Sequence, residues 1–295
     1  MPVSHKHPER HHYWTLGKLL CFSLLLLLSI LTLLPLVLTF LYSFFPQSEI
    51  KAYLALRNNY NTEMWMDFLI SPKQATVRQY YTILIDNPQY LKLFCNSVMY
   101  TVMILAGQAL VVPLTSYCLT KFEFRGRDAL FFVILALMLL PFQVTMTPTV
   151  ITLRTLGLMD TIWAVILPMW FSPFYIFLLR QFMLAIPNDM FEAGMMDGCG
   201  PVRSYVHVMV PCCKPILCAA AALSFADCWN MVEQPLVYLA NNTGLQPLSV
   251  MFNQLNAEGT EVAFAGAALY ILPALLVYLY FQEDILLGVQ LSELK

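Results

Sequence analysis

Six long apolar stretches dominate this sequence and constrain its fold more than any other feature. A helix that crosses about 30 Å of hydrocarbon needs about 20 mostly apolar residues. Only 12% of the residues are charged, against about 25% in an ordinary soluble domain. The sequence therefore predicts an all-α, polytopic membrane protein whose membrane domain covers residues 19–285. Its six transmembrane helices are expected over residues 19–45, 95–119, 129–152, 161–179, 215–240 and 262–281.

The first apolar stretch follows charged residues, as the apolar core of a signal peptide would. It is longer than the usual core of about 7 to 15 residues, and no small-residue cleavage pattern follows it. We therefore expect a retained membrane anchor.

The positions of Lys and Arg predict which connections face the cytoplasm, because short cytoplasmic loops hold an excess of positive charge. Placing both termini inside assigns most of the basic residues of the short connections to the cytoplasm, and the long outer segment counts for less. The prediction is a cytoplasmic N-tail (1–18), an extracytoplasmic loop (46–94), a cytoplasmic loop (187–211) and a cytoplasmic C-tail (286–295). The basic residues placed inside are Lys6, Arg10, Lys18, Lys121, Arg125, Arg127, Arg180, Arg203, Lys214 and Lys295.

Charge and cysteine usage argue against two other classes. The formal net charge is −2 and no long basic block occurs, so no surface for nucleic acid is indicated. Cys212, Cys213 and Cys218 lie close in sequence with only His207 nearby, whereas zinc normally takes four ligands. The histidines of the N-tail are more typical of a solvated tail than of a chelate. We expect neither a metal site nor structural disulfides.

The predicted cytoplasmic loop 187–211 carries the densest set of structural signals. Pro187 blocks the preceding helix, and Asp189 with Glu192 has the spacing of a capping box. A short helix is expected to begin there. Gly198 and Gly200, followed by proline, are expected to end it before a second segment over residues 202–210.

This loop resembles the coupling motif of ABC importer permeases, which reads Glu-Ala-Ala, three residues, Gly, nine residues, Ile-x-Leu-Pro. Glu192, Ala193, Gly198 and Pro211 match it in register, and Asp197 lies within it. Gly194 replaces the second Ala, a change that weakens a helix by about 1 kcal/mol. The resemblance implies a type I importer permease fold in which residues 192–198 dock on a cytoplasmic ATPase. Without that resemblance, Glu192 reads as a helix cap.

Other segments are similar to the carbohydrate importers among these permeases, specifically the smaller, maltose-permease-like subunit of the pair. They are residues 70–72, 80–81, 96–97, Trp229-Asn230 and Pro235-Leu236. The resemblance implies a bacterial inner-membrane location and a homologous second permease as partner. It also implies a cytoplasmic ATPase dimer that binds ATP and Mg, and an extracytoplasmic binding protein.

The chain has no phosphate-binding loop of its own. Its one Gly-Lys pair, Gly17-Lys18, lacks both the upstream Gly and the following Ser or Thr. We therefore expect a transport subunit without a cofactor or catalytic residues, with ATP hydrolysis in a partner.

The fifth apolar stretch contains a polar set. Asp227, Asn230 and Gln234 are spaced by three and four residues, which predicts one helical face. A charged residue in hydrocarbon is costly and usually faces a cavity or a partner. The set suits either a pathway for hydroxyl-rich ligands or contact with another helix. The third stretch holds Gln143, Thr145, Thr147 and Thr149, to which we assign no role because threonine often bonds its own helix.

Three alternatives stay open at this point. A secondary transporter would show internal repeats or further midplane charges, and Asp227 is the one clear charge in mid-span. An intramembrane enzyme would need a catalytic motif, and none occurs. An ABC permease for another solute, such as peptides, amino acids or phosphate, would share the coupling loop.

Overall fold

The structure, a computed structural model, describes residues 16–58, 72–86, 88–187, 189–196, 198–253 and 260–293. The regular elements in these ranges are all helical, which confirms the predicted all-α polytopic fold. Four uninterrupted or slightly broken spans are long and apolar enough to cross a membrane. They are α1 (Leu16–Tyr42), α4 (Pro88–Lys121), the pair α7 (Ile162–Trp170) and α8 (Pro173–Leu184), and α15 (Thr260–Glu293).

Two further spans are present only if each is counted as a bent pair of helices. The pair α5 (Arg127–Leu139) and α6 (Phe142–Thr155) is bent by 110°. The segment Pro201–Cys212 is bent by 76° against α12 (Lys214–Trp229). The predicted helices over 129–152, 161–179 and 215–240 are therefore not continuous, although the sequence correctly places apolar spans there.

Shorter helices fill the connections. The predicted C-tail, 286–295, continues α15 as far as Glu293. The remaining elements are α2 (Gln47–Asn58), α3 (Arg78–Tyr81), η1 (Thr82–Asp86), α9 (Asp189–Met196), α10 (Pro201–Ser204), η2 (Tyr205–Met209), α11 (Val210–Cys212), α13 (Glu233–Tyr238), η3 (Thr243–Leu245) and α14 (Leu248–Asn253).

Proline causes two of the three breaks in the apolar spans. A residue that precedes proline is pushed out of the helical region into extended backbone. Leu140, before Pro141, has φ −75° and ψ 130°, and Ser172, before Pro173, has φ −109° and ψ 108°. The third break follows Trp229, where Val232 leaves helical geometry with φ −125° and ψ −50°. These spans therefore turn inside the apolar stretch rather than at its ends.

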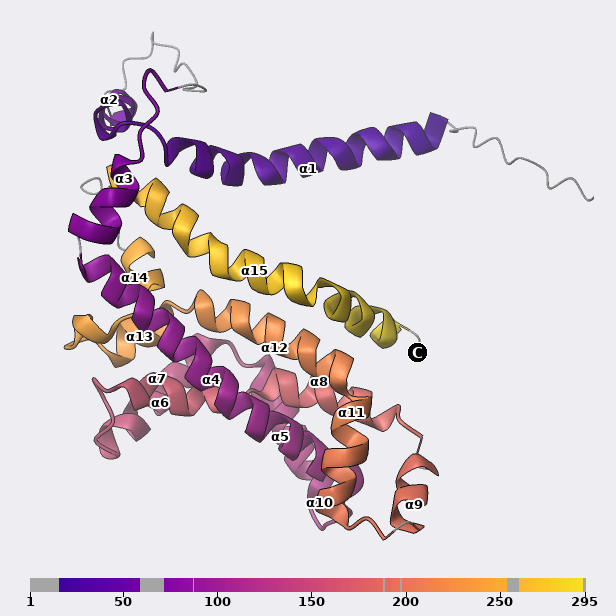
Figure 1. Cartoon of the computed structure of the whole chain (residues 1–295). Helices are drawn as coiled ribbons and strands as arrows, with labels where there is room; N and C mark the ends of the chain where they lie inside the picture. Colours follow the sequence, from indigo (N-terminus) through magenta and orange to yellow (C-terminus); the bar gives the residue numbers. More distant parts are fainter. Residues whose placement is uncertain are drawn as a thin grey trace, which may run out of the picture.

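Helix α4 is the central element, since it packs against α7, α8 and α12 (Figure 1). Its buried residues join three hydrophobic clusters in order along the helix. Tyr90 lies in a cluster with α14 and α15, Tyr100 in one with α6, α7 and α13, and Tyr117 in one with α5, α8 and α12. One helix thus connects all three parts of the core.

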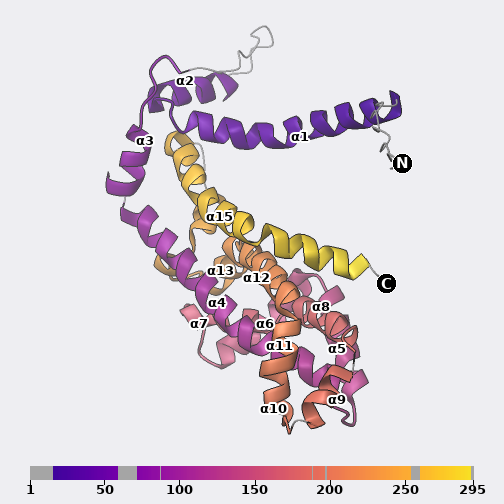
Figure 2. The same cartoon turned by 45° about the vertical axis from the view of Figure 1, so that its right-hand side comes forward.

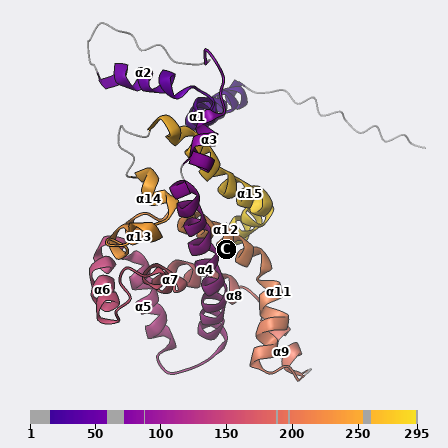
Figure 3. The same ribbon diagram turned by 60° about the vertical axis from the view of Figure 1, so that its left-hand side comes forward.

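Helix α1 stands apart from this bundle (Figures 1 and 3). It packs against α15, and at its final turn the centroid of the Tyr42 ring lies 5.2 Å from that of the Phe264 ring. Gln79 secures the following turn by donating to the carbonyl oxygens of Tyr42 and Phe45 at 2.9 and 2.7 Å. The rest of α1 is apolar and exposed, so its surface is available to lipid or to another protein.

The ends of the long helices sort into two groups. In Figure 1 the start of α1, the end of α15 and α9 lie toward the right, while α2, α3, α13 and α14 lie toward the left. Figure 2 shows α9 and α10 at the extremity opposite α2. The short helix α9 therefore lies at one pole of the bundle, far from the α2 end.

Candidate substrate cavity and coupling segment

A cavity of about 490 Å³ lies where the three helix breaks meet. We call it the substrate cavity, after the role that we propose for it below. Helix breaks within a membrane are tolerated where the irregular backbone lines a cavity or is buried in protein. Its lining comes from α4, α5, α6, α7, α8, α12 and α13: Gln108, Leu137, Met138, Leu140, Phe142, Thr145, Thr149, Pro168, Met169, Phe171, Ser172, Pro173, Phe174, Tyr175, Ser224, Asp227, Cys228, Gln234 and Tyr238.

Neighbouring side chains satisfy the carbonyl groups that the prolines release. Proline has no N–H, so the carbonyl four residues earlier loses its helical partner. Pro173 would leave Met169 in this state, and Gln108 Nε2 donates to that oxygen at 2.7 Å. At the third break, Met231 lies between α12 and α13, and its carbonyl oxygen accepts from Ser249 Oγ. The breaks are therefore stable parts of the fold, fixed by α4 and α14.

Polar groups from separate helices converge on the substrate cavity. The Tyr175 hydroxyl of α8 donates to Asp227 Oδ2 of α12 at 2.6 Å. Gln234 of α13 joins them in the lining. Thr145 and Thr149 of α6 bond their own helix backbone, at 3.0 and 2.8 Å, as expected, yet both also line the cavity. A hydroxyl-rich ligand would meet acceptors, donors and five aromatic rings here.

Asn230 is separated from the other two residues of the predicted polar set. Helix α12 ends at Trp229, so the prediction that Asp227, Asn230 and Gln234 share one helical face is wrong. Asn230 Nδ2 donates to the carbonyl oxygen of Ala226 at 3.0 Å, and its Oδ1 accepts from the Tyr270 hydroxyl of α15 at 3.3 Å. Asn230 contacts a neighbouring helix, while the other two line the substrate cavity.

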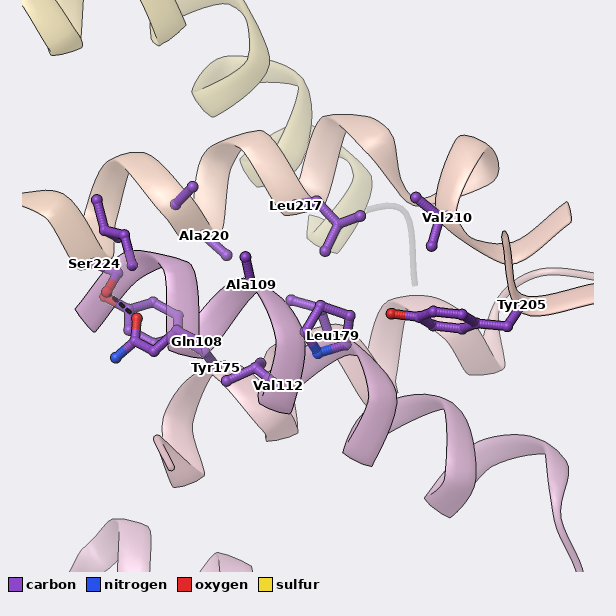
Figure 4. Close-up of a pocket in the computed structure, with 13 residues that line it drawn as sticks. Gln108, Ala109, Val112, Tyr175, Leu179, Tyr205, Val210, Leu217, Ala220 and Ser224 are labelled. Carbon is purple, nitrogen blue, oxygen red and sulfur yellow. Dashed lines mark hydrogen bonds between the residues drawn. The ribbon is translucent and has the colours of Figure 1, made fainter. Parts of the chain in front are cut away.

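A second cavity of about 230 Å³ adjoins the first (Figure 4). Gln108, Tyr175 and Ser224 line both cavities. The Ser224 hydroxyl donates to the side-chain oxygen of Gln108, as the dashed line in Figure 4 marks. Tyr205 and Val210 line the opposite end of this second cavity. A polar layer thus separates the substrate cavity from a space that reaches the segment around η2.

The short helix α9 begins at Asp189, as predicted, and presents two different faces. Phe191 is 7% exposed and belongs to the core, whereas Met196 is 88% exposed. Glu192 and Ala193 are exposed. Asp197 lies outside the described residues. The described part of this helix therefore has a solvent-facing surface with both a carboxylate and apolar groups, and the predicted coupling residues Glu192 and Ala193 lie on it.

Gly198 ends α9, as the sequence predicts. Its φ of +80° is a left-handed conformation that glycine adopts without a steric penalty. The N–H of Cys199 donates to the carbonyl oxygen of Gly194 at 2.9 Å, which is the longer hydrogen bond of a Schellman cap. The cap fixes the direction in which the chain leaves the helix.

Two contacts attach this segment to the end of α4. The Tyr117 hydroxyl donates to the carbonyl oxygen of Pro201 at 3.1 Å. The ammonium nitrogen of Lys121 lies 3.9 Å from the centroid of the Phe191 ring, within the range of a cation–π contact. These contacts join the α9–α10 segment to the last turns of α4.

The second predicted segment, 202–210, is helical and starts one residue earlier, at Pro201. It contains a π-helix, η2, directly before α11. Pro211 lies in α11, is exposed, and follows this wider turn. A π-turn is a known way of accommodating a helix irregularity, and such turns are frequent at functional sites.

The cysteines are free thiols, and Cys213 is buried with its Sγ 3.5 Å from Met209 Sδ. Among the residues that the structure describes, no three His, Cys, Asp or Glu side chains lie close enough to hold a metal ion. The N-tail residues His5, His7, His11 and His12 lie outside the described ranges.

Comparisons with known proteins agree with this geometry. The chain matches the family described as "Binding-protein-dependent transport system inner membrane component" over residues 94–283. It is 27% identical to the arabinooligosaccharides transport system permease protein AraQ of Halalkalibacterium halodurans over 91% of this chain and 93% of the relative. It is 30% identical to the sn-glycerol-3-phosphate permease UgpE of Pectobacterium atrosepticum over 67% of this chain and 72% of the relative.

Solved structures show the same fold. A bacterial ABC transporter involved in import of the acidic polysaccharide alginate has a chain that aligns with a TM-score of 0.77 and 22% identity, covering 94% of this chain and 99% of that one. The match confirms the fold expected from the resemblance. The family match rules out the secondary transporter and the intramembrane enzyme. This chain therefore belongs to the inner membrane components of binding-protein-dependent transport systems, the permeases of ABC importers, and is a transport subunit rather than an enzyme.

Proposed function

We propose that this chain forms one half of the membrane pathway of an ATP-driven importer of oligosaccharides. Relatives named for arabinooligosaccharides and for diacetylchitobiose support that class of cargo. The observation that carries the proposal is the substrate cavity itself. Its hydroxyl, amide and carboxylate groups sit among aromatic rings, a mixture that suits directional binding of a hydroxyl-rich ligand.

In this proposal Asp227 and Gln234 belong to the pathway, together with Thr145, Thr149 and Tyr175. All five line the substrate cavity on separate helices or helix turns. Asn230 has a different role, since its contact with Tyr270 supports packing of α12 on α15. The cavity meets the polar layer of Gln108 and Ser224, which lies on the side toward the coupling segment.

The exposed face of α9 is proposed to dock on an ATPase subunit. Glu192, Ala193 and Met196 form this face, and Gly194 packs inward, where an added Cβ would lie 3.7 Å from Val208. Gly194 therefore replaces the motif's alanine without leaving a gap on the docking surface. Asp197, Gly198 and Pro211 complete the proposed coupling set. Closure of an ATPase dimer, which holds ATP and Mg, would move α9 and, through Tyr117 and Lys121, the end of α4.

The proposed orientation places α9 and both termini in the cytoplasm. The start of α1 and the end of α15 point toward the same side as α9 in Figure 1, which supports this arrangement. Segment 46–94, with α2 and α3, would then face the extracytoplasmic binding protein. A related alginate transporter has been solved with a periplasmic protein bound, which supports a partner of that kind. A homologous second permease would complete the pathway, and the exposed apolar surface of α1 would face that subunit or lipid.

The test is uptake of radiolabelled oligosaccharides by cells that carry the whole transporter, comparing the parent with Glu192→Ala. We expect uptake to fall at least tenfold while the protein remains in the membrane and loses its ATPase on purification. The matched control is Glu123→Ala, which removes another exposed carboxylate from the connection after α4. If uptake and ATPase association are both unchanged in Glu192→Ala, Glu192 acts only as a helix cap and has no role in coupling.

A photocrosslinking amino acid tests the docking surface without removing a charge. Placed at the exposed position Ala193, it should join this chain to the ATPase. Placed at Tyr81, which is 55% exposed at the opposite pole, it should not. Crosslinking from Tyr81 but not from Ala193 would place the ATPase on the wrong side of the bundle.

The relatives differ in the charge of the compounds for which they are named. Some relatives are named for transport of uncharged saccharides and others for transport of a phosphate ester, and the solved neighbour is involved in the import of an acidic polysaccharide.

A further inference from the structure

We infer that the substrate cavity selects uncharged saccharides and rejects anionic ones, with Asp227 as the determinant. The inference rests on the proposed function, because it concerns the charge of the cargo that passes through the same cavity. It assigns to one residue of this chain a specificity that its relatives' names do not settle.

The first argument is the charge of the cavity wall. Among the described residues that line the substrate cavity, Asp227 is the one acidic side chain, and there is no Lys, Arg or His. The other polar members are hydroxyls and amides. A carboxylate or phosphate on the cargo would therefore meet a negative charge and find no positive partner on this chain.

Basic residues on the same helices lie away from the cavity. Arg154 is in the last turn of α6, and Lys214 is the first residue of α12, 13 positions before Asp227. At about 1.5 Å per residue, that separation is about 20 Å along the helix. Arg180 of α8 is closer in sequence to the cavity, but its guanidinium carbon lies 3.7 Å from the centroid of the Phe131 ring. The other basic residues of the lining helices, Lys92, Lys121 and Arg127, are likewise absent from the described lining, so no cation there offsets the Asp227 charge.

The second argument is that Asp227 is held in place and accessible. The Tyr175 hydroxyl, 2.6 Å from Oδ2, fixes the carboxylate from the neighbouring helix. Asp227 is nevertheless exposed, so it can also accept from a ligand hydroxyl. Hydrogen bonds from a hydroxyl to a carboxylate are stronger than those between neutral groups. An uncharged saccharide would gain such a bond, whereas an anionic one would meet repulsion.

The expected discrimination is about tenfold or more, because two like charges a few ångströms apart at a protein surface repel more strongly than they do in bulk water. The test uses arabinotriose, maltotriose and diacetylchitobiose, each as the neutral alditol made by reducing its reducing end and as the aldonic acid made by oxidising it. Both members of a pair are open-chain at that end, so they differ mainly in charge. Saturation-transfer NMR on the purified permease–ATPase complex, without binding protein, detects weak binding of each member. Uptake of the neutral members by cells is measured in parallel.

In the parent complex we expect at least one neutral saccharide to bind about tenfold more tightly than its aldonic acid. In Asp227→Asn, which keeps the shape of the side chain, the ratio should fall to about threefold or less. Thr149→Val removes a polar group from the same cavity without changing its charge, so it should leave the ratio unchanged. Gln234→Lys adds a cation to the cavity and should reverse the preference, which tests the inference even if Asp227→Asn fails to fold.

The outcomes separate the two proposals. If neutral saccharides bind and enter cells but the ratio is the same in the parent, Asp227→Asn and Gln234→Lys, charge selection by this cavity is wrong and the proposed function stands. If the parent binds an aldonic acid as tightly as its neutral partner, the inference is also overturned. If no saccharide of either charge binds or enters, the proposed cargo class fails, and the inference fails with it.

Discussion

Ser224 on α12 and Gln108 on α4 are joined by a hydrogen bond at the boundary between the two cavities. Gln108 also donates to the carbonyl oxygen of Met169, which Pro173 deprives of its helical partner. One amide thus connects α4, the end of α7 and α12. The Gln108 side chain donates through its nitrogen and accepts through its oxygen, so removing either group leaves a buried polar atom of a neighbouring residue unpaired.

Gln108→Leu is expected to lower the free energy of unfolding by about 1–3 kcal/mol, because the Met169 carbonyl would stay unpaired in an apolar environment. Ser224→Ala should also cost about 1–3 kcal/mol, since it leaves the buried side-chain oxygen of Gln108 without its donor. Equilibrium unfolding of the purified protein in mixed detergent micelles measures both. Gln143→Leu, at an exposed position of α6, is the control and should change stability by less than either.

Gly107→Ala is expected to prevent normal packing of α4 on α7. A Cβ at this position would overlap the Trp170 ring, whose Nε1 donates to the Met103 carbonyl oxygen at 3.1 Å. The yield of monodisperse protein on size exclusion should fall sharply. The double variant Gly107→Ala with Trp170→Leu should recover much of it, because the smaller side chain makes room. A single Gly107→Ala variant that is as stable as the parent would contradict this close approach.

The sequence predicted where the apolar spans lie but not where three of them break. Hydropathy measures the length of an apolar stretch, and it contains no term for a bend inside it. Proline alone is not a sufficient signal, since Pro113 and Pro148 lie inside continuous helices while Pro141 and Pro173 mark breaks. At Pro173 the released Met169 carbonyl is paired by the distant Gln108, whereas at Pro141 the Leu137 carbonyl accepts from the backbone N–H of Leu140, and neither partner is visible in a hydropathy profile.

The same limit applies to the site. Asp227 and Gln234 were found because a polar residue in an apolar stretch is conspicuous. Tyr175 and Gln108 were missed, because their importance arises from contacts with residues 52 and 116 positions away in sequence. Asn230 was placed on the wrong surface, because the spacing rule assumed that one helix continues through residue 234. In the structure the helix ends at Trp229.

Glycine substitutions around α9 should have effects of different sign. Gly198→Ala places a side chain at φ +80° and is expected to cost about 1–2 kcal/mol locally, which would loosen the docking helix. Gly194→Ala should stabilise α9 by up to about 1 kcal/mol, because space is available there. Hydrogen exchange of the α9 amides in the purified protein measures both effects.

Gly200→Ala is the matched control for these two variants, since its φ of −70° suits any residue. Equal exchange protection in Gly198→Ala and Gly200→Ala would show that the left-handed turn does not hold the end of α9.

Asp160 is expected to fix the connection that follows α13. Its φ is +61°, and its carboxylate accepts from both the backbone N–H and the side-chain amide of Asn241, each at 2.9 Å. Asp160→Ala should increase protease cleavage near residues 241–243 and lower the melting temperature. Asp160→Asn should have a smaller effect, because asparagine also adopts this backbone region and keeps one acceptor oxygen. Indistinguishable cleavage of both variants and the parent would rule out this role.

The separation of the two proposed sites has an evolutionary consequence. None of the described residues that line the substrate cavity lies between Asp189 and Cys212, where the coupling segment is found. Mutations that alter cargo preference can therefore accumulate without disturbing the surface that meets the ATPase. Permeases encoded by duplicated copies of such a gene could diverge in cargo while continuing to bind the same ATPase.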